Sequence, residues 1–270
     1  MLSMGEQEFK QFTEFLRYNY GINLSKKKSL IEGRLSNMLM EKGYDNFSEY
    51  LNYVYADCTK QEMTTLINKL TTNHTFFMRE FSHFEFFRDK ILPYITPRDK
   101  ERDLRIWSAG CSTGEEPYTL AMVMADYFAE EHKAWNTKML ATDISVNVLQ
   151  AAEKGEFAAE GLQDIPTAWK VNYFSKVENE TYRVKDKIRD EVIFRVFNLM
   201  DEVFPFKQKF HVIFCRNVMI YFDDEIKLKL LKKLYEATEP GGYLFIGHAE
   251  SISKYNTGYR YVLPAVYRKG

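Results

Sequence analysis

Hydrophobic side chains in the first third of the chain recur at helical spacing. The first stripe is formed by Phe9, Phe12, Phe15 and Leu16, and no alternating strand pattern interrupts residues 6–92. Four further stripes follow, within residues 30–39, 47–54, 63–70 and 84–95. This periodicity predicts an all-α domain, a small helical bundle, over residues 1–96.

The pattern changes after residues 97–103, a charged segment that we interpret as a linker. From residue 104 to residue 270, short apolar runs alternate with amphipathic segments. The expected strands are 105–108, 138–142, 192–197, 211–215, 243–247 and 261–267, with helices near 117–131, 145–153 and 223–237. This order predicts an α/β domain with a mostly parallel sheet, helices on both faces and an antiparallel edge. Residues 155–190 break the alternation, and we interpret them as an insertion that includes a small hairpin.

Composition narrows the class of protein. The 270 residues are 45% hydrophobic and carry a net charge of -1, so a sizeable core is possible and no global field favours nucleic acid or a membrane surface. The cysteines Cys58, Cys111 and Cys215 form neither a paired framework nor a C-x-x-C motif. No run approaches the roughly 18 apolar residues of a membrane span. We therefore expect a cytoplasmic protein.

The turn after the first expected strand carries the strongest chemical signal. Residues 107–118 read WSAGCSTGEEPY, in which small residues allow a ligand close to the backbone before Glu115 and Glu116 open a helix. The spacing differs from the dinucleotide motif G-x-G-x-x-G. Two carboxylates here would repel a pyrophosphate and suit a cationic or hydroxyl-rich ligand. An ordinary helix start with acidic residues in its first turn is the alternative.

Three further segments end expected strands at the same sheet edge. Asp143 suits a contact to ribose hydroxyls, or caps the following helix. Asn198 and Leu199 could border an adenine, or form an ordinary turn. Arg216 and Asn217 follow the fourth strand, where function is the favoured interpretation.

Residues 71–80, TTNHTFFMRE, form a polar segment that we expect to be helical. Arg79 could bind a carboxylate from this side, although a solvated helix face is the alternative.

Together, the segments TTNHTFFMRE, WSAGCSTGEEPY, ATDIS, FNLMD, CRNVMIYF and PGGYLFIGHAES closely resemble the chemotaxis-receptor glutamate methyltransferases, the CheR family. The likeness runs from about Phe9 to Tyr267. It implies a class I S-adenosylmethionine-dependent methyltransferase domain, Rossmann-like, preceded by an all-α domain, with residues 155–190 as a β-subdomain. In some members that subdomain binds a peptide from the receptor C-terminus. Residues 247–250 read GHAE where GHSE is commoner.

The resemblance implies a role for each site residue. The cofactor is S-adenosylmethionine, with S-adenosylhomocysteine as product and no metal. Contacts to the cofactor fall to Asn73, Thr75, Arg79 (methionine carboxylate), Glu115 or Glu116 (methionyl end), Asp143 (ribose), Asn198 and Leu199 (adenine), and Arg216 and Asn217. Tyr221 matches a family tyrosine near the transferred methyl group. Arg216 and Tyr221 are the catalytic candidates, expected to position the acceptor.

The expected acceptor is a receptor glutamate, which is ionised at pH 7 because its pKa is about 4.3, so no general base is needed. The helix expected over residues 25–42 is basic, and we predict that Lys27, Lys28 and Arg34 dock on an acidic helix of the receptor's cytoplasmic bundle. A solvated face is the alternative. We expect a monomer that neither binds nucleic acid nor inserts into a membrane.

Two other functions compete. A methyltransferase for nucleic acid or a small molecule is disfavoured because residues 215–218 read CRNV rather than an Asn/Asp-Pro-Pro-Tyr-type segment. A non-catalytic S-adenosylmethionine sensor would keep the pocket and lose the acceptor side. Retention of Arg216, Asn217 and Tyr221 disfavours it.

Overall fold

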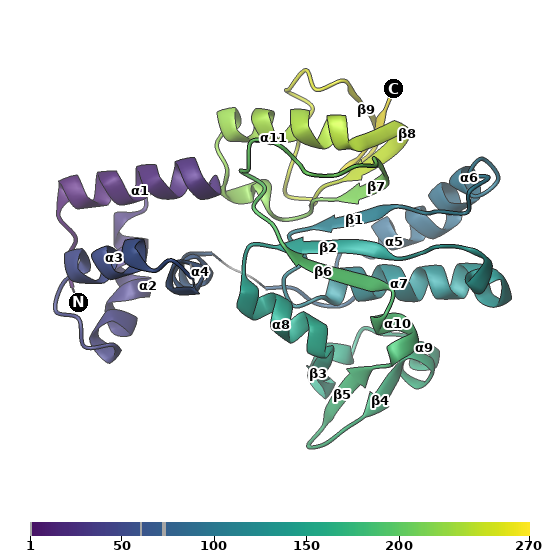
Figure 1. Ribbon diagram of the computed structural model, residues 1–270, viewed down its shortest axis with the longest axis horizontal. Helices are drawn as coiled ribbons and strands as arrows, with labels where there is room; N and C mark the ends of the chain where they lie inside the picture. The colour runs from purple at the N-terminus through teal and green to yellow at the C-terminus, as the bar shows by residue number, and fades with distance from the viewer. Residues whose placement is uncertain (1, 60, 72–73) are drawn as a thin grey trace.

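The computed structural model describes residues 2–59, 61–71 and 74–270. Its first part is the expected bundle, built from α1 (Glu6–Tyr20), α2 (Lys28–Glu41), α3 (Phe47–Ala56) and α4 (Gln61–Leu70). The four helices bury one shared core around Phe12, Leu35 and Tyr50. Gly21 ends α1 at a φ of 74°, a conformation that glycine adopts at little cost. In Figure 1 the bundle lies at one end of the molecule.

The second part is a seven-stranded sheet in the order β6-β2-β1-β7-β8-β10-β9. Its strands are β1 (Ile106–Ala109), β2 (Met139–Asp143), β6 (Val192–Val196), β7 (Phe210–Phe214), β8 (Thr238–Phe245), β9 (Tyr259–Leu263) and β10 (Val266–Lys269). The first five strands of that order are parallel, whereas β10 runs antiparallel to both neighbours. The α/β prediction with an antiparallel edge is confirmed. The expected single strand 261–267 is wrong, because a turn with Ala265 at a φ of 63° folds it into the β9–β10 hairpin.

Helices cover both faces of this sheet. In Figure 1, α7 (Glu115–Phe128) and α8 (Val146–Lys154) lie below it and α11 (Asp224–Ala237) lies above it. Short 3-10 turns follow at Ala129–Ala134 and Met219–Tyr221. Because the parallel strands end on the same side, their carboxyl ends form one edge that faces the bundle.

Two expectations for the segment between the domains differ from the structure. The helical stripe at 84–95 forms α5 (Ser82–Phe86), a π-helical turn (Phe87–Ile91) and α6 (Leu92–Ile95), and it packs on the sheet core instead of the bundle. Phe87 meets Phe214 of β7 edge-on, with ring centroids 5.8 Å apart. Residues 74–80 form a loop instead of a helix, because Met78 and Glu80 have φ values of 63° and 56°. The domain limits 1–96 and 104–270 stay a prediction, and this packing favours an earlier division.

The insertion at 155–190 folds as a small antiparallel sheet in the order β3-β5-β4. Its strands are β3 (Glu156–Ala158), β4 (Phe174–Lys176) and β5 (Thr181–Val184), joined by η3 (Ala159–Leu162) and α9 (Thr167–Tyr173) and followed by α10 (Asp186–Arg189). The expected hairpin is β4–β5, and β3 adds a third strand. Phe77 packs edge-on against Phe157 and Phe174, so the loop between the domains also contacts this small sheet.

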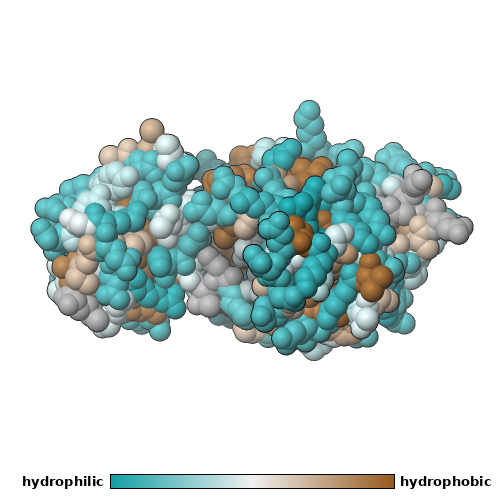
Figure 2. Space-filling view, turned by 90° about the horizontal axis from the view of Figure 1, so that it is seen from below, coloured by the Kyte–Doolittle hydropathy of each residue, from teal (hydrophilic) through white to brown (hydrophobic). Residues whose placement is uncertain are grey.

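The face seen in Figure 2 is mostly hydrophilic, with hydrophobic side chains scattered singly or in small groups. Across the described residues, the structure contains no helix with both the length and the apolar character that crossing a membrane requires.

Candidate active site

A cavity opens where the carboxyl ends of β1, β2 and β7 face the bundle. Both domains line it: Tyr20, Ile22 and Ile67 from the bundle, and the turns after the strands from the other side. Thus the four segments that sequence analysis placed at one sheet edge do meet there.

The turn after β1 forms one wall of this cavity. Gly110 and Gly114 have φ values of 87° and 97°, which only glycine adopts without strain. Ser112 donates its backbone N–H to Asp143 Oδ2 at 2.9 Å, and the Ser145 N–H binds Asp143 Oδ1 at 3.0 Å. Burial raises the pKa of the Asp143 carboxyl. Each carboxylate oxygen still has a lone pair that can accept a hydrogen bond from a ligand hydroxyl.

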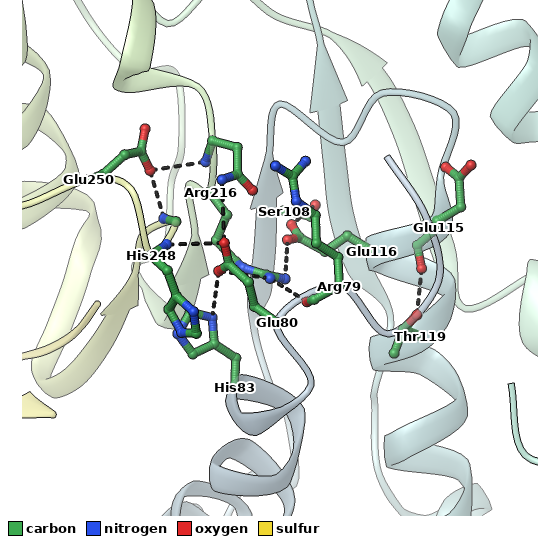
Figure 3. Close-up of polar contacts among 12 residues, drawn as sticks. Arg79, Glu80, His83, Ser108, Glu115, Glu116, Thr119, Arg216, His248 and Glu250 are labelled. Carbon is green, nitrogen blue, oxygen red and sulfur yellow. Dashed lines mark hydrogen bonds and ion pairs between the residues drawn. The ribbon is translucent and has the colours of Figure 1, made fainter. Parts of the chain in front are cut away.

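The two acids that open α7 point in different directions. Glu116 lines the cavity, where its Oε1 accepts from Ser108 Oγ at 2.7 Å. Glu115 does not line it; its Oε2 accepts from Thr113 Oγ1 at 2.7 Å, and Figure 3 shows its carboxylate directed away from Glu116. Burial raises the pKa of the Glu115 carboxyl. Of the two alternatives, the geometry favours Glu116 as the acid that can contact a ligand.

Arg216 lies between two carboxylates (Figure 3). Its Nη1 is 2.9 Å from Glu116 Oε2, its Nη2 is 3.1 Å from Glu80 Oε2, and its side chain is 2% exposed. Nη2 also donates to the carbonyl oxygen of Arg79. We call Glu80, Glu116 and Arg216 the charge triad. Because both Nη atoms have partners, the guanidinium connects Glu80, Glu116 and the Arg79 backbone and so stabilises the cavity wall.

Asn217 adopts a φ of 60° directly after Arg216. Its backbone N–H donates to Glu250 Oε2 at 2.9 Å, and Gly247 donates to the same oxygen at 2.6 Å. Burial raises the pKa of the Glu250 carboxyl. A Cβ on Gly247 would lie 2.3 Å from Asn217 Nδ2, so this glycine leaves the space that the asparagine occupies.

The loop between the domains supplies Thr75 and Arg79, which both line the cavity. Arg79 Nη1 donates to the His74 carbonyl oxygen at 2.8 Å, and its guanidinium carbon lies 5.8 Å from the centroid of the Phe76 ring. Asn73 lies outside the described residues.

The remaining cavity residues also connect the domains. Asn198 donates from Nδ2 to the Asn19 carbonyl oxygen of α1 at 2.8 Å, and its Oδ1 accepts from the Met200 N–H at 2.9 Å. Leu199 is 9% exposed and lines the cavity beside it. Tyr221 also lines the cavity, and its carbonyl oxygen accepts from the Asn23 N–H at 2.9 Å.

Sequence reasoning missed Glu80 and Glu250. Glu80 ends the segment TTNHTFFMRE and Glu250 ends GHAE, so each adjoins residues that were singled out. No sequence spacing predicts them, because each binds a residue that is distant in the chain. Glu80 binds Arg216, 136 positions away, and Glu250 binds Asn217, 33 positions away.

The expected docking cations have different surroundings. Lys27 is exposed directly before α2, which begins three residues later than expected. Lys28 pairs with Glu6. Arg34 donates from Nη1 to the Leu70 carbonyl oxygen at 2.8 Å and so caps the end of α4.

Comparison with known proteins covers almost the whole chain. Residues 7–71 match the CheR methyltransferase all-alpha domain, and residues 73–266 match the CheR methyltransferase SAM binding domain. A chemotaxis protein methyltransferase of Borreliella burgdorferi is 42% identical, covering 99% of this chain and 96% of that protein. A chemotaxis protein methyltransferase of Escherichia coli is 33% identical, covering 93% of this chain and 87% of that protein.

Proposed function

Because the chain belongs to the CheR methyltransferase family, we propose that it transfers the methyl group of S-adenosylmethionine to glutamate side chains of a chemotaxis receptor. As a member of that family it is an S-adenosylmethionine-dependent methyltransferase of chemotaxis. The glutamate acceptor and the site residues below are our proposal, supported chiefly by the cavity that both domains line.

The donor set in the cavity fits this ligand. S-adenosylmethionine carries a ribose, an ammonium, a carboxylate and an adenine, and supplies an electrophilic methyl group on a sulfonium. The partly buried Asp143 carboxylate suits ribose hydroxyls, and Glu116 suits the ammonium. Arg79 offers N–H groups beyond the one that it donates to His74, and these suit the carboxylate.

The adenine would lie beside Leu199. Asn198 keeps one amide hydrogen and one oxygen lone pair beyond its contacts with Asn19 and Met200, which would serve the base edge. Thr75 and Asn217 would complete the wall, and we extend the proposal to Asn73 on the resemblance alone. Glu115 is directed elsewhere, so we propose a structural role for it.

The acceptor side needs orientation more than acid–base chemistry. A glutamate with a pKa of about 4.3 is already a carboxylate at pH 7. Holding it in line with the methyl group can contribute roughly 7–11 kcal/mol. Tyr221 at the cavity is our candidate for contacting it. Arg216, expected at first to do the same, would act by fixing Glu116, because both of its Nη atoms are engaged.

The receptor would approach over the bundle. Lys27 is exposed beside α2, which suits an acidic receptor helix. Lys28 and Arg34 belong to the same basic surface but have partners within the bundle.

Transfer of labelled methyl groups from S-adenosylmethionine to a receptor cytoplasmic fragment tests this function. We expect label on the protein that mild base releases as methanol, because carboxyl methyl esters are base-labile. Replacing the accepting glutamates by alanine should abolish the label. Base-stable label would contradict the glutamate acceptor, and binding of S-adenosylmethionine without any transfer would favour the sensor.

A further inference from the structure

Glu80 joins three segments that meet behind the cavity (Figure 3). Its Oε2 is 3.1 Å from Arg216 Nη2, and its Oε1 accepts from the His248 N–H at 3.0 Å. Asn217 Nδ2 lies 3.4 Å from the same Oε1. We propose that Glu80 is a positioning residue for methyl transfer, which neutralises Arg216 for a cationic donor and ties the Arg79 loop to the ends of β7 and β8.

The first part of this role follows from charge. Arg216 is a buried cation at the cavity wall, and the ligand proposed for the cavity carries a positive sulfonium. With Glu80 and Glu116 both ionised, the charge triad has a net charge of about -1, which favours that ligand. Burial opposes ionisation of Glu80, but the Arg216 charge and the His248 N–H outweigh it, and the pKa of Glu80 is lowered. Without the Glu80 charge, the triad would be neutral and less favourable to a cation.

The second part follows from the backbone around Arg79. Met78 and Glu80 both adopt positive φ, so the chain turns sharply on either side of Arg79. The Arg79 carbonyl accepts from Arg216 Nη2, and the next side chain binds Arg216 and the His248 N–H. These contacts hold the peptide on both sides and so orient the Arg79 side chain toward the cavity.

A cation site is the competing interpretation of the same residues. Glu80, His83 and His248 offer ligand atoms within 4.8 Å of one another. However, the Glu80 Oε2 that faces His83 Nδ1 at 3.4 Å is the same atom that binds Arg216. A divalent ion there would lie beside a guanidinium and be repelled. The geometry therefore assigns this carboxylate to Arg216.

The test compares two ligands that differ in charge. S-adenosylmethionine has a sulfonium and S-adenosylhomocysteine has a neutral sulfur, so we would measure both dissociation constants by calorimetry. Glu80→Gln should raise the dissociation constant of S-adenosylmethionine at least about tenfold and that of S-adenosylhomocysteine only about twofold. Glu80→Asp, which keeps the charge, should restore most of this preference. Glu85→Gln, an exposed neighbour in α5, should leave both constants unchanged.

A double variant isolates the charge and covers the case in which Glu80→Gln lowers the melting temperature. Glu80→Gln with Arg216→Gln removes both charges, so the ratio of the two constants should return to within about twofold of wild type. Equal weakening of both ligands in Glu80→Gln, or no weakening, would overturn the inference, because a merely structural residue does not distinguish sulfonium from thioether.

The inference rests on the proposed binding of the donor in this cavity, and Asp143→Asn tests that separately. It should raise both dissociation constants by at least about tenfold, because each ligand loses its ribose contact. Unchanged binding in Asp143→Asn would contradict the cavity assignment itself. Weakened binding in Asp143→Asn with none in Glu80→Gln would contradict the role of Glu80 alone.

Discussion

His83 is a fully buried imidazole beside the charge triad, and it shows how one residue can make stability depend on pH. Its Nδ1 lies 3.4 Å from Glu80 Oε2, and its ring meets His248 edge-on at 4.7 Å. Burial, with help from the Arg216 charge and against Glu80, lowers the pKa of His83 to about 3. The imidazole is therefore neutral in the folded protein at ordinary pH.

Acid should destabilise the protein through this group. The pKa of His83 in the folded protein lies below its unfolded value of 6.5, so between pH 6.5 and pH 3 the unfolded chain binds a proton that the folded protein does not. The stability that the neutral imidazole contributes is therefore complete above pH 6.5 and is lost as the pH falls toward 3. Between pH 7 and pH 5 the free energy of unfolding should fall by about 2 kcal/mol from this group. Urea unfolding at both pH values measures it. His83→Gln should remove that part of the difference, whereas the exposed His74→Gln should not; equal pH dependence in both variants would contradict the assignment.

Single residues differ in how far the sequence can specify them. Asp143 and one of the two acids that open α7 could be predicted at the cavity, because parallel strands bring their carboxyl ends to one edge. The choice between Glu115 and Glu116 could not, since adjacent helical residues point about 100° apart and either could have faced inward. Glu80 was missed because its position depends on the two left-handed turns at Met78 and Glu80, which no residue pattern marks.

Among the elements, α2 and the residues before it carry basic side chains in two different surroundings. Lys27 at its start is exposed, as is the preceding Lys26, whereas Arg34 is tied to the end of α4 through the Leu70 carbonyl. Of the basic face predicted from charge alone, one part is thus exposed, where we propose that the receptor docks, and another part supports the bundle internally. Only contacts can separate the two, because both kinds look alike in a sequence.

Charge reversal at Lys26 and Lys27 should raise KM for the receptor with little change in KM for S-adenosylmethionine. We expect at least about a fivefold increase at low salt, shrinking as salt screens the surface charges. Steady-state kinetics at two salt concentrations measure it. Arg34→Ala should instead lower the melting temperature by a few degrees through the lost cap. Receptor kinetics unchanged by the double reversal would contradict docking on this surface.

The segment at 84–95 shows the same limit for a whole helix. Its apolar stripe correctly predicted helical structure, yet the stripe says nothing about which core receives it. Phe84 and Phe87 pack against Phe214 of β7, so the segment belongs to the sheet core. A periodic hydrophobic pattern identifies the buried face of a helix but does not specify what that face packs against.

For the whole molecule, the cavity depends on how the bundle meets the sheet domain. Arg17 of α1 binds the cap of α11, with its Nε 2.5 Å from Asp223 Oδ2 and its Nη2 2.7 Å from Glu225 Oε2. Asn23 and Asn198 add hydrogen bonds between the domains. These contacts lie beside the cavity residues Asn198 and Tyr221. The arrangement of the domains and the shape of the site are therefore linked.

Arg17→Ala should loosen the contact between α1 and α11 and raise the dissociation constant of S-adenosylhomocysteine about twofold to fivefold. The effect is modest because the Arg17 side chain is 37% exposed and solvent screens its ion pairs. Calorimetry at low and high salt measures it, and the difference from wild type should shrink at high salt. Arg98→Ala, which removes a cation stacked on Tyr94, serves as the control. Equal effects of both variants would argue against a link through Arg17.

The central claim is that one ligand binds in the cavity that both domains line, beside the charge triad. A crystal structure of the protein with S-adenosylhomocysteine tests it most directly. We predict density for the ribose at Asp143, for the adenine beside Leu199 and for the homocysteine carboxylate at Arg79. Ligand density outside the cavity, or inside it with Arg79 out of contact, would contradict the account.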